Sequence, residues 1–399
     1  MAAMILSVPW WLYQRLASLW RTNAEPLSDY FVPRPHDKLN RRYLIHTKLG
    51  AGVWSSTWLV SDTTAQKDKR YLAVKVLTLD ATKEHNGGIM LERKFLQEIT
   101  DKGPLEHLPA LLDVFTVPRS GGQSHLCFAM DVYGQDVASF RRSAPQKALP
   151  VFTVKVIIKQ VLRGVVGLHR QGIVHTDIKP DNMLLGTKMD ADALDEWLKT
   201  LGPSAMDGEV HPLPAEYRYD DPREKVKGMN VTLIDLGQAQ RAGPVGSQTA
   251  KMFSAFSLRA PEIILRSDFG TAIDIWAIGC IVFEMITGRW LFHPEGGDED
   301  WSIEDDHLAK MIELTGERFS AAMLQRSQNA REYFDGNGDL LRVPELFYVK
   351  LEDALANYKT LIDDEVGPAA EFIKACIRLE PADRPTAEAL QAHPWLTGI

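Results

Sequence analysis

HTDIKPDN, residues 175–182, has the most informative residue spacing in this chain, and the apolar run MLL follows it at residues 183–185. Asp177, Lys179 and Asn182 place a carboxylate, an amine and a side-chain amide at short, fixed intervals. In phosphoryl transfer, a carboxylate accepts the proton of the attacking hydroxyl, a lysine neutralises charge on the moving phosphate, and an amide holds Mg²⁺. The alternative is an ordinary polar turn between a helix and an apolar strand. The order of the other motifs along the chain favours the first interpretation.

A glycine-containing segment, LGAGVWS, occupies residues 49–55 between apolar runs at residues 42–49 and 56–60. The two runs alternate apolar and polar residues, which predicts the strands of a hairpin. Gly50 and Gly52 would let the backbone of the turn approach a phosphate. The third glycine of the usual pattern is Ser55 here, and most Gly-x-Gly pairs are simply turns, so this segment is a weak signal by itself.

Further motifs flank these two segments. A short β-rich run, YLAVKVL at residues 71–77, places Lys75 between valines, which by itself is typical of a half-exposed strand. A helix-like stretch at residues 88–99 has apolar residues at intervals of three and four. Later in the chain come VTLIDLG at 231–237, RAPE at 259–262, DIWAIG at 274–279 and DRPTAEAL at 383–390.

The stretch at residues 175–182 resembles the catalytic loop of protein kinases, and the other motifs follow the order of that family. The resemblance implies an α+β, bilobal fold with a small antiparallel β lobe that carries one main helix, and a large, mainly helical lobe. We place the small lobe at residues 39–130, the hinge at 131–133 and the large lobe at 134–396. Residues 1–38 are then an N-terminal extension.

The resemblance also implies a role for each matched residue. ATP would lie between the lobes, with its adenine against the hinge and Mg²⁺ on its phosphates. The implied cofactor-binding residues are Leu49, Gly50, Ala51, Gly52, Ser55, Ala73, Lys75, Asp131 and Tyr133. The implied catalytic residues are Asp177, Lys179, Lys75 and Glu92, and the implied metal ligands are Asn182 and Asp235.

Two glutamates compete as the partner of Lys75. Glu92 is preferred to Glu98 because Leu96 follows it one turn later on the predicted buried side, the arrangement that the family pattern favours. Either carboxylate could equally be a solvated helix charge. In the large lobe, the family pattern pairs Glu262 with Arg384 and uses Asp274 to hold the catalytic loop.

Three features narrow the resemblance to SR-protein kinases, a branch of the CMGC group. Thr176 stands where arginine is usual, the glycine loop ends in Ser55, and the third motif is Asp-Leu-Gly. Residues 290–316 look like the insert of that family, which we extend to 290–350. The sequence departs from the family at residues 259–262, where Arg-Ser-Leu-Glu is expected, and at Leu258, where tyrosine is common. These departures leave another CMGC substrate preference open.

A second insertion, at residues 186–230, follows the catalytic loop. Leu194, Trp197, Leu198 and Leu201 fall on one helical face, and the rest is rich in proline and acidic residues. We predict a helix that covers the large lobe, followed by an irregular strap. A partner-binding role is the alternative.

Charge indicates the kind of partner. The net charge of −8 argues against nucleic acid as the main ligand and favours a basic protein. Seven acidic residues crowd into residues 295–306, namely Glu295, Asp298, Glu299, Asp300, Glu304, Asp305 and Asp306. A solvated loop would explain such a run. The resemblance instead implies a groove for Arg/Ser-rich substrates of the splicing type, with charge complementarity steering them to it.

Composition constrains the setting. The chain has 399 residues, 45% hydrophobic and 25% charged, enough for two cores. Three cysteines lie in apolar runs without ligand spacing, which predicts buried thiols in a reduced compartment, cytoplasmic or nuclear. No apolar run of 18 or more residues could span a bilayer. The apolar segment 8–21 predicts a weak targeting sequence, an interfacial helix or a stretch that packs on the domain. We expect a monomer.

Regulation and a different function class remain to be distinguished. Thr176 cannot supply a guanidinium to bind an activation-loop phosphate, so we expect constitutive activity. Ser247, Thr249, Ser254 and Ser257 are candidate modification sites or simply loop residues, and residues 235–262 contain no tyrosine, which weakens the alternative of a tyrosine-autophosphorylating CMGC kinase. A pseudokinase scaffold is the other class. It usually lacks a counterpart of Lys75, Asp177, Asn182 or Asp235, and this chain retains all four.

Overall fold

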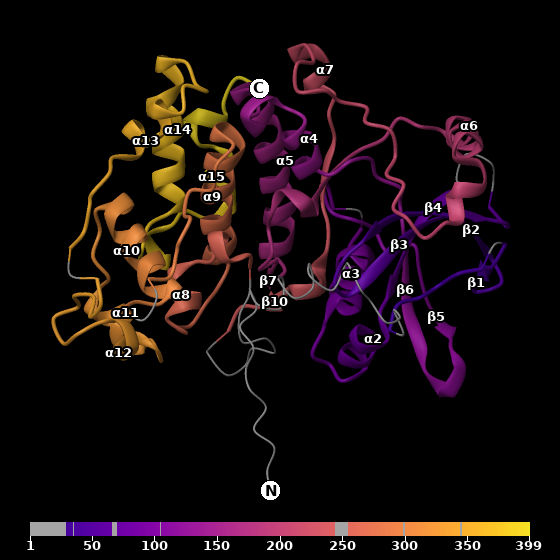
Figure 1. Cartoon of the computed structure of the whole chain (residues 1–399), viewed down its shortest axis with the longest axis horizontal. Coiled ribbons are helices and arrows are strands. Elements are labelled where there is room, and N and C mark those ends of the chain that lie inside the picture. The colour runs from indigo at the N-terminus through magenta and orange to yellow at the C-terminus, as the bar shows by residue number, and fades with distance from the viewer. Residues whose placement is uncertain are drawn as a thin grey trace, which may run out of the picture.

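The computed structural model describes residues 29–34, 36–65, 70–103, 105–243, 254–297, 300–343 and 345–399. These residues form a smaller part rich in strands and a larger, mainly helical part, at the right and left of Figure 1. The predicted α+β class with a small β lobe and a large helical lobe is confirmed. The apolar segment 8–21 lies outside the described residues.

The small lobe is built on one six-stranded antiparallel sheet with the strand order β1-β2-β3-β4-β6-β5. Its strands are β1 (Lys38–Leu39), β2 (Tyr43–Ala51), β3 (Ser55–Asp62), β4 (Tyr71–Leu77), β5 (Asp113–Pro118) and β6 (Ser124–Met130). Alternate residues of β2, including Tyr43, Ile45 and Thr47, are buried, because successive side chains of a strand point to opposite faces. The hairpin predicted around the glycines is confirmed, with Ala51 opposite Ser56 in the register of β2 and β3.

Two helices accompany the sheet. α2 (Leu79–Asn86) begins at Thr78, whose hydroxyl accepts a hydrogen bond from Ala81 N. α3 (Glu92–Asp101) buries Phe95, Leu96 and Ile99; Ile99 follows the other two at intervals of four and three, so all three lie on one face of the helix. This burial fixes the orientation of α3 and therefore of Glu92 at its first turn.

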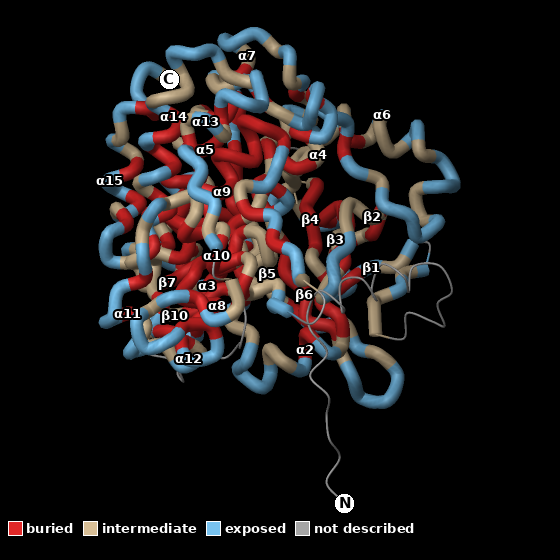
Figure 2. Tube along the Cα trace, turned by 60° about the vertical axis from the view of Figure 1, so that its left-hand side comes forward, coloured by how far each residue is buried: buried red, intermediate tan, exposed pale blue. Residues whose placement is uncertain are grey.

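The large lobe surrounds two long helices, α5 (Val151–His169) and α9 (Ala272–Thr287), and Figure 2 shows the buried trace concentrated around them. Every residue of α9 from Ile273 to Thr287 is buried, as expected for a helix that is apolar on nearly all sides. Gly279 permits this packing, because a Cβ there would lie 2.6 Å from the Cβ of Cys376 on α14. Other helices of this lobe are α4 (Val137–Arg142), α8 (Pro261–Ile264), α13 (Leu351–Asn357), α14 (Asp363–Cys376) and α15 (Ala387–Gln391).

Two short antiparallel strand pairs carry the site residues of the large lobe. β7 (Ile173–Val174) pairs with β10 (Gln240–Arg241), and β8 (Met183–Leu185) pairs with β9 (Val231–Leu233). The catalytic-loop stretch connects β7 to β8, and Asp235 follows β9. The two pairs therefore bring the predicted catalytic and metal-binding segments side by side.

The insertion at residues 186–230 does not cover the large lobe alone, which corrects our expectation. Its first helix, α6 (Ala191–Leu201), packs on the small lobe, where Leu194 lies in one apolar cluster with Leu59 of β3 and Tyr71 of β4. Asp195 of α6 also accepts hydrogen bonds from Tyr71 Oη (2.5 Å) and from Arg70. The later helix α7 (Arg223–Lys227) contacts α5 of the large lobe. The insertion thus leaves one lobe, docks on the other and returns, as the path from α6 to α7 shows in Figure 1.

The insert at residues 290–350 contains α10 (Ile303–Thr315), α11 (Ala321–Arg326) and α12 (Ala330–Tyr333). α10 begins with a capping box, in which Ser302 and Asp305 satisfy each other's backbone N–H groups. The three cysteines, Cys127, Cys280 and Cys376, are buried and unpaired, as predicted. Among the helices of the described residues, none has the length and apolar character that a membrane crossing requires.

Candidate active site

Asp274, in the first turn of α9, holds the backbone of the catalytic-loop stretch. Its carboxylate accepts hydrogen bonds from the backbone N–H groups of His175 (2.8 Å) and Thr176 (2.9 Å), and His169 Nε2 lies 2.9 Å from it. Asp274 is only 1% exposed, so water cannot easily replace these bonds. Thr176 has a φ of 68°, an uncommon conformation for a β-branched residue that persists only where the surroundings impose it. The loop is therefore held in one shape by a residue about 100 positions away.

The side chains of Asp177, Lys179 and Asn182 lie together. Lys179 Nζ donates to Asp177 Oδ2 at 2.7 Å, and Asn182 Nδ2 donates to the Asp177 carbonyl at 2.8 Å and to Asp177 Oδ2 at 3.2 Å. Burial by itself would lower the pKa of Lys179, but the Asp177 carboxylate outweighs it and raises that pKa. The lysine is therefore a fixed cation beside the candidate base.

Asp235 lies next to Asn182 because β8 and β9 are antiparallel neighbours. Ile234 N donates to Asn182 O at 2.9 Å, so Asp235 is one residue beyond the residue that faces Asn182. Asp235 has a φ of 70°, and Gly237 N donates to its Oδ1 at 3.3 Å. This turn favours glycine at position 237, since a Cβ there would come within 3.0 Å of Asp235 Oδ1.

Lys75, on β4, joins the two lobes. Its Nζ donates to Glu92 Oε1 at 2.6 Å and to Asp235 Oδ1 at 2.9 Å. Burial would lower the pKa of Lys75, but the Asp235 and Glu92 carboxylates outweigh it and raise that pKa above its ordinary value. In return, although burial opposes ionisation of Asp235, the Lys75 ammonium lowers the pKa of Asp235 to about 2. Lys75 and Asp235 therefore form a charged pair at neutral pH, whereas burial outweighs the nearby Lys75 ammonium at Glu92 and raises the pKa of that carboxyl group.

Glu98, the rival candidate, lies away from Lys75. It forms an ion pair with Arg241 of β10, whose guanidinium also lies 5.2 Å from the centre of the Phe95 ring. Arg241 therefore ties the segment after Asp235 to α3, so that Glu92 keeps its place against Lys75. Sequence reasoning missed Arg241, because nothing in its local pattern distinguishes it from a solvated arginine.

The glycine loop leaves room for a ligand. A Cβ at either Gly50 or Gly52 would meet no heavy atom within 4 Å, so packing within the protein does not explain these glycines. The turn is closed by a hydrogen bond from Gly52 N to Ser55 O at 2.9 Å. The open space at both positions, together with the fixed Lys75 ammonium, fits a phosphate chain that approaches the backbone closely.

The predicted hinge follows β6 directly. Ala73 of β4 is opposite Met130 of β6, so the implied adenine site lies at the end of this strand pair. Asp131 is exposed, whereas burial raises the pKa of Tyr133 to about 12 and keeps its phenol protonated. Gly134 N donates to Leu185 O of β8 at 2.7 Å. The hinge is thus attached to the strand that follows the catalytic loop.

Thr176 also contacts the activation segment, the stretch between Asp235 and Glu262. Its Oγ1 donates to Gln238 O at 2.8 Å, and Ser254 Oγ donates to Thr176 O at 2.5 Å. The residue that replaces the usual arginine therefore joins both ends of the segment to the catalytic loop. Ser247 and Thr249 lie outside the described residues.

The predicted pair of Glu262 and Arg384 is fully buried. Arg384 donates to both carboxylate oxygens of Glu262, at 2.6 and 2.9 Å, and both side chains are at most 1% exposed. The guanidinium also lies 4.9 Å from the centre of the Trp276 ring and donates to Arg378 O. This bidentate pair joins the end of the activation segment to the C-terminal part of the large lobe.

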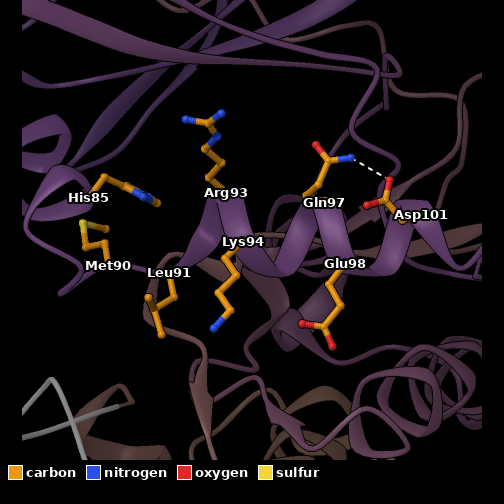
Figure 3. Close-up of a pocket in the computed structure, with 8 residues that line it drawn as sticks. All are labelled: His85, Met90, Leu91, Arg93, Lys94, Gln97, Glu98 and Asp101. Atoms are coloured by element: carbon orange, nitrogen blue, oxygen red, sulfur yellow. Dashed lines mark hydrogen bonds between the residues drawn. The ribbon is translucent and has the colours of Figure 1, made fainter.

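A shallow cavity of about 500 Å³ lies along the exposed side of α3. Figure 3 shows its lining, with Arg93 and Gln97 on one side of the helix and Lys94 and Glu98 on the other. Its lining includes both positive and negative side chains and lacks Asp177, Asn182 and Asp235. The cavity is therefore separate from the candidate active site.

The acidic run of residues 295–306 is partly used by the fold itself. Asp305 is completely buried and accepts hydrogen bonds from Ser302 and from Arg342 Nε (2.8 Å). Asp306 accepts hydrogen bonds from Lys310 Nζ at 2.5 Å and from Glu295 N at 2.7 Å. Glu295 and Asp300 are exposed and Glu304 is half-buried, whereas Asp298 and Glu299 lie outside the described residues.

The comparisons with known proteins agree with this geometry. Residues 43–396 match the family model described as protein kinase domain. The chain is 29% identical over 381 residues to a protein named serine/threonine-protein kinase SRPK from Physarum polycephalum, which covers 90% of this chain and 86% of the relative. It is 26% identical to protein kinase dsk1 of Schizosaccharomyces pombe, over 95% of this chain and 86% of that protein, and 23% identical to mouse SRSF protein kinase 3, over 92% and 88%.

The chain therefore belongs to the protein kinase family, and it is a protein serine/threonine kinase. Within that family it is similar to the SR-protein kinases, as the sequence motifs predicted. A kinase domain implies the use of ATP.

Proposed function

We propose that this kinase transfers the γ-phosphate of ATP, as its magnesium complex, to serine in basic, Arg/Ser-rich proteins. The observation that carries the proposal is that Lys75 of the small lobe pairs with Asp235 of the large lobe, while Lys179 holds Asp177 in the neighbouring catalytic loop. Asn182 belongs to the same group through its bonds to Asp177.

Binding of ATP is assigned to both lobes. Gly50 and Gly52 leave room for the phosphates, and the Lys75 ammonium, fixed by Glu92, neutralises part of their charge. The other cofactor-binding residues that the family pattern implies are Leu49, Ala51, Ser55, Ala73, Asp131 and Tyr133. Because Lys75 is held before a ligand arrives, little reorganisation is needed when the phosphates bind.

Magnesium is assigned to Asn182 and Asp235. The amide nitrogen of Asn182 donates to Asp177, which leaves its amide oxygen as the atom to coordinate a cation. One carboxylate and one amide oxygen suit Mg²⁺, which retains waters and takes its other ligands from phosphates. When bound, the ion would neutralise charge that develops on the phosphates.

Proton removal from the substrate serine is assigned to Asp177. Its Oδ2 is oriented by Lys179 and Asn182, so the carboxylate faces one direction only. Lys179 remains protonated and stabilises negative charge on the transferred phosphate. Positioning and charge stabilisation supply most of the catalysis in reactions of this class.

Preference for basic substrates is supported by the acidic run, in a narrower form than its composition indicates. Asp305 and Asp306 hold the insert together, so the residues available to a substrate among the described ones are Glu295, Asp300 and Glu304. The departures at residues 258–261 keep another CMGC-type substrate preference as the alternative. The retained Lys75, Asp177, Asn182 and Asp235 argue against a pseudokinase.

Constitutive activity is supported by contacts that need no phosphate. Thr176 holds Gln238 and Ser254, and Arg241 pairs with Glu98. These bonds order both ends of the activation segment in the unmodified chain. We also propose a monomer in the cytoplasm or nucleus, and the three buried thiols support a reducing compartment.

A peptide panel tests the proposed function. Purified, dephosphorylated protein is assayed with MgATP and radiolabelled phosphate against Arg-Ser, Ser-Pro and acidic serine peptides, with Asp177→Ala as the inactive reference. We expect transfer to Arg-Ser peptides at the highest kcat/KM. Equal and negligible signals from wild type and Asp177→Ala would favour the scaffold interpretation, and a preference for Ser-Pro would favour the other CMGC substrate class.

A further inference from the structure

Tyr30 precedes the part of the chain that matches the kinase domain, residues 43–396, yet it contacts the glycine loop of that domain. The Tyr30 hydroxyl donates to the carbonyl oxygens of Gly52 (2.9 Å) and Val53 (2.7 Å), which form the tip of the glycine loop. A single phenolic proton shared between two acceptors holds both carbonyls on the same side. The tip is therefore bound by a residue more than 20 positions earlier in the chain.

The segment that carries Tyr30 is itself anchored. Asp29 O accepts a hydrogen bond from Leu79 N at 3.0 Å, and Asp29 Oδ1 accepts one from Asp80 N at 3.1 Å. On the other side of Tyr30, the Phe31 ring packs edge-on against Trp58, with the ring centres 6.2 Å apart. Tyr30 is thus supported from both neighbours, by the start of α2 and by the sheet.

A third carbonyl of the tip is held as well. Trp54 O accepts a hydrogen bond from Thr78 N at 2.9 Å, at the connection between β4 and α2. Three consecutive carbonyls, those of residues 52, 53 and 54, therefore accept hydrogen bonds from Tyr30 and Thr78. Gly52 and Val53 are themselves exposed, so side-chain packing does little to fix this turn.

Because the peptide bond is planar, these contacts also fix the direction of the N–H groups that follow the bound carbonyls. The carbonyl of one residue and the N–H of the next belong to one rigid plane and point in opposite directions. When the Gly52 and Val53 carbonyls are turned to Tyr30, the N–H groups of Val53 and Trp54 are turned away from it. The orientation of two backbone donors is thus set by one hydroxyl.

We propose that Tyr30 is a positioning residue for ATP, which holds the Val53 and Trp54 N–H groups toward the nucleotide phosphates. The inference rests on the proposed function, because it assumes that the glycine loop binds ATP. Without the hydroxyl, the exposed tip samples orientations in which these donors face elsewhere, and binding must then supply the ordering. The contribution is confined to ligands that carry phosphates.

The test compares ATP with adenosine, using the full chain, wild type beside Tyr30→Phe, and isothermal titration calorimetry in the presence of Mg²⁺. We expect the Kd for ATP to rise about 3- to 10-fold, as the loss of one hydrogen bond predicts, and the Kd for adenosine to change less than about 1.5-fold. Hydrogen exchange of the segment around residues 50–57 should become faster in Tyr30→Phe and stay unchanged elsewhere.

Tyr43→Phe is the matched control. It removes the same atom from a tyrosine of β2, where the Tyr43 hydroxyl donates to Asp113 at 2.6 Å, at the opposite end of the strand from the loop. The ratio of the ATP and adenosine affinities should match that of wild type in this variant. An unchanged ratio in Tyr30→Phe, or an equal loss for both ligands, would overturn the positioning role. If wild type binds adenosine and ATP with the same affinity, the phosphate-binding assignment of the proposed function fails first.

Discussion

The two lobes hold their shares of the site in different ways. In the large lobe, the buried Asp274 carboxylate binds the backbone of the catalytic loop. The buried pair of Glu262 and Arg384 fixes the end of the activation segment. In the small lobe, Lys75 is held through α3, and the glycine-loop tip is held from outside by Tyr30. Side chains in the large-lobe contacts are almost fully buried, whereas the loop tip is exposed.

This difference separates chemistry from nucleotide binding. A buried network leaves unpaired charges when one member is removed, so it tolerates little movement. Exposed contacts cost less to break, so the parts that they hold can move when a ligand enters and leaves. Changes in the large lobe should therefore alter turnover or folding, and changes in the small lobe should alter mainly ATP binding and local order.

The largest effect is expected at Asp177. Asp177→Asn removes the proposed base but keeps the shape of the side chain, so kcat should fall by about 10³ while the Kd for ATP changes less than about 2-fold. Stopped-flow or radiometric turnover and calorimetry measure the two quantities. Asp181→Asn, an exposed carboxylate in the same loop, is the control and should keep nearly full activity. Parallel losses of kcat and ATP affinity in Asp177→Asn would contradict the claim that the large lobe governs turnover and the small lobe governs ATP binding.

The next effect concerns stability in the large lobe. Glu262→Gln leaves the Arg384 guanidinium buried without its carboxylate, so the free energy of unfolding should drop by about 3–5 kcal/mol. Urea denaturation followed by tryptophan fluorescence measures this loss. Glu388→Gln breaks the exposed pair with Arg170 and should cost less than about 1 kcal/mol. Equal costs in the two variants would mean that burial does not govern these ion pairs.

A smaller change in catalysis is expected at Glu92, the partner of Lys75 on α3. Glu92→Gln removes a charge-assisted bond of 2.6 Å to Lys75, so kcat/KM for ATP should fall roughly 10- to 100-fold. Glu98→Gln disturbs the partly exposed pairs with Arg241 and Lys102 and should cost about 5-fold or less. Steady-state kinetics at varied ATP distinguish the two. A greater loss in Glu98→Gln would reverse the assignment of the lysine's partner.

The dependence of stability on pH probes the rigid large lobe. His307 of α10 is completely buried, and burial, with the nearby charges of Arg259 and Lys310, lowers its pKa to about 3. In the unfolded chain a histidine has a pKa near 6.5, so between about pH 6.5 and 3 only the unfolded state binds the proton and stability falls with falling pH.

His307→Leu should therefore remove about 1–2 kcal/mol of the stability loss between pH 7 and pH 5, measured by urea denaturation at each pH. His293→Leu removes a histidine whose side chain is 63% exposed and serves as the control. The steeper pH dependence should belong to the chain that retains His307. Identical slopes for wild type and His307→Leu would contradict a buried neutral imidazole.

The smallest effect is expected where the insertion meets the small lobe. Asp195→Asn weakens the hydrogen bonds from Arg70, which is partly exposed, and from Tyr71, which lies at the edge of the core. The free energy of unfolding should fall by about 1 kcal/mol. Hydrogen exchange should become faster in β4 and α6 and remain unchanged in α9. Glu196→Gln, one residue along and exposed, is the control. Equal protection of β4 in both variants would show that α6 does not stabilise the lobe.

Several parts of the fold and the site could be predicted from the sequence because they depend on local pattern. The hairpin around Gly50 and Gly52 follows from alternating residues and a turn, and the stretch with Asp177 and Asn182 follows from fixed spacing. The structure brings Lys75 to Glu92, as preferred, but the distances among these segments could not be read from one sequence.

Other parts were out of reach or predicted wrongly. The apolar face of α6 predicted that the helix packs on another part of the protein. An apolar face alone does not show which surface it contacts, and the helix packs on the small lobe instead of the large one. The acidic run at residues 295–306 predicted carboxylates accessible to solvent or substrate, yet Asp305 is buried and accepts a hydrogen bond from Arg342. Arg241 and Tyr30 gave no local signal, since each acts through residues far along the chain.

The amino-acid sequence alone determined which chemical groups this kinase carries and in which order, because residue type and short-range spacing are properties of the chain itself. Tertiary structure alone decided which of those groups meet. Glu92 rather than Glu98 reaches Lys75, and Asp274 holds the catalytic loop, because apolar burial of α3 and α9 fixes their directions in space. Such contacts depend on the packing of distant segments, which no local pattern contains.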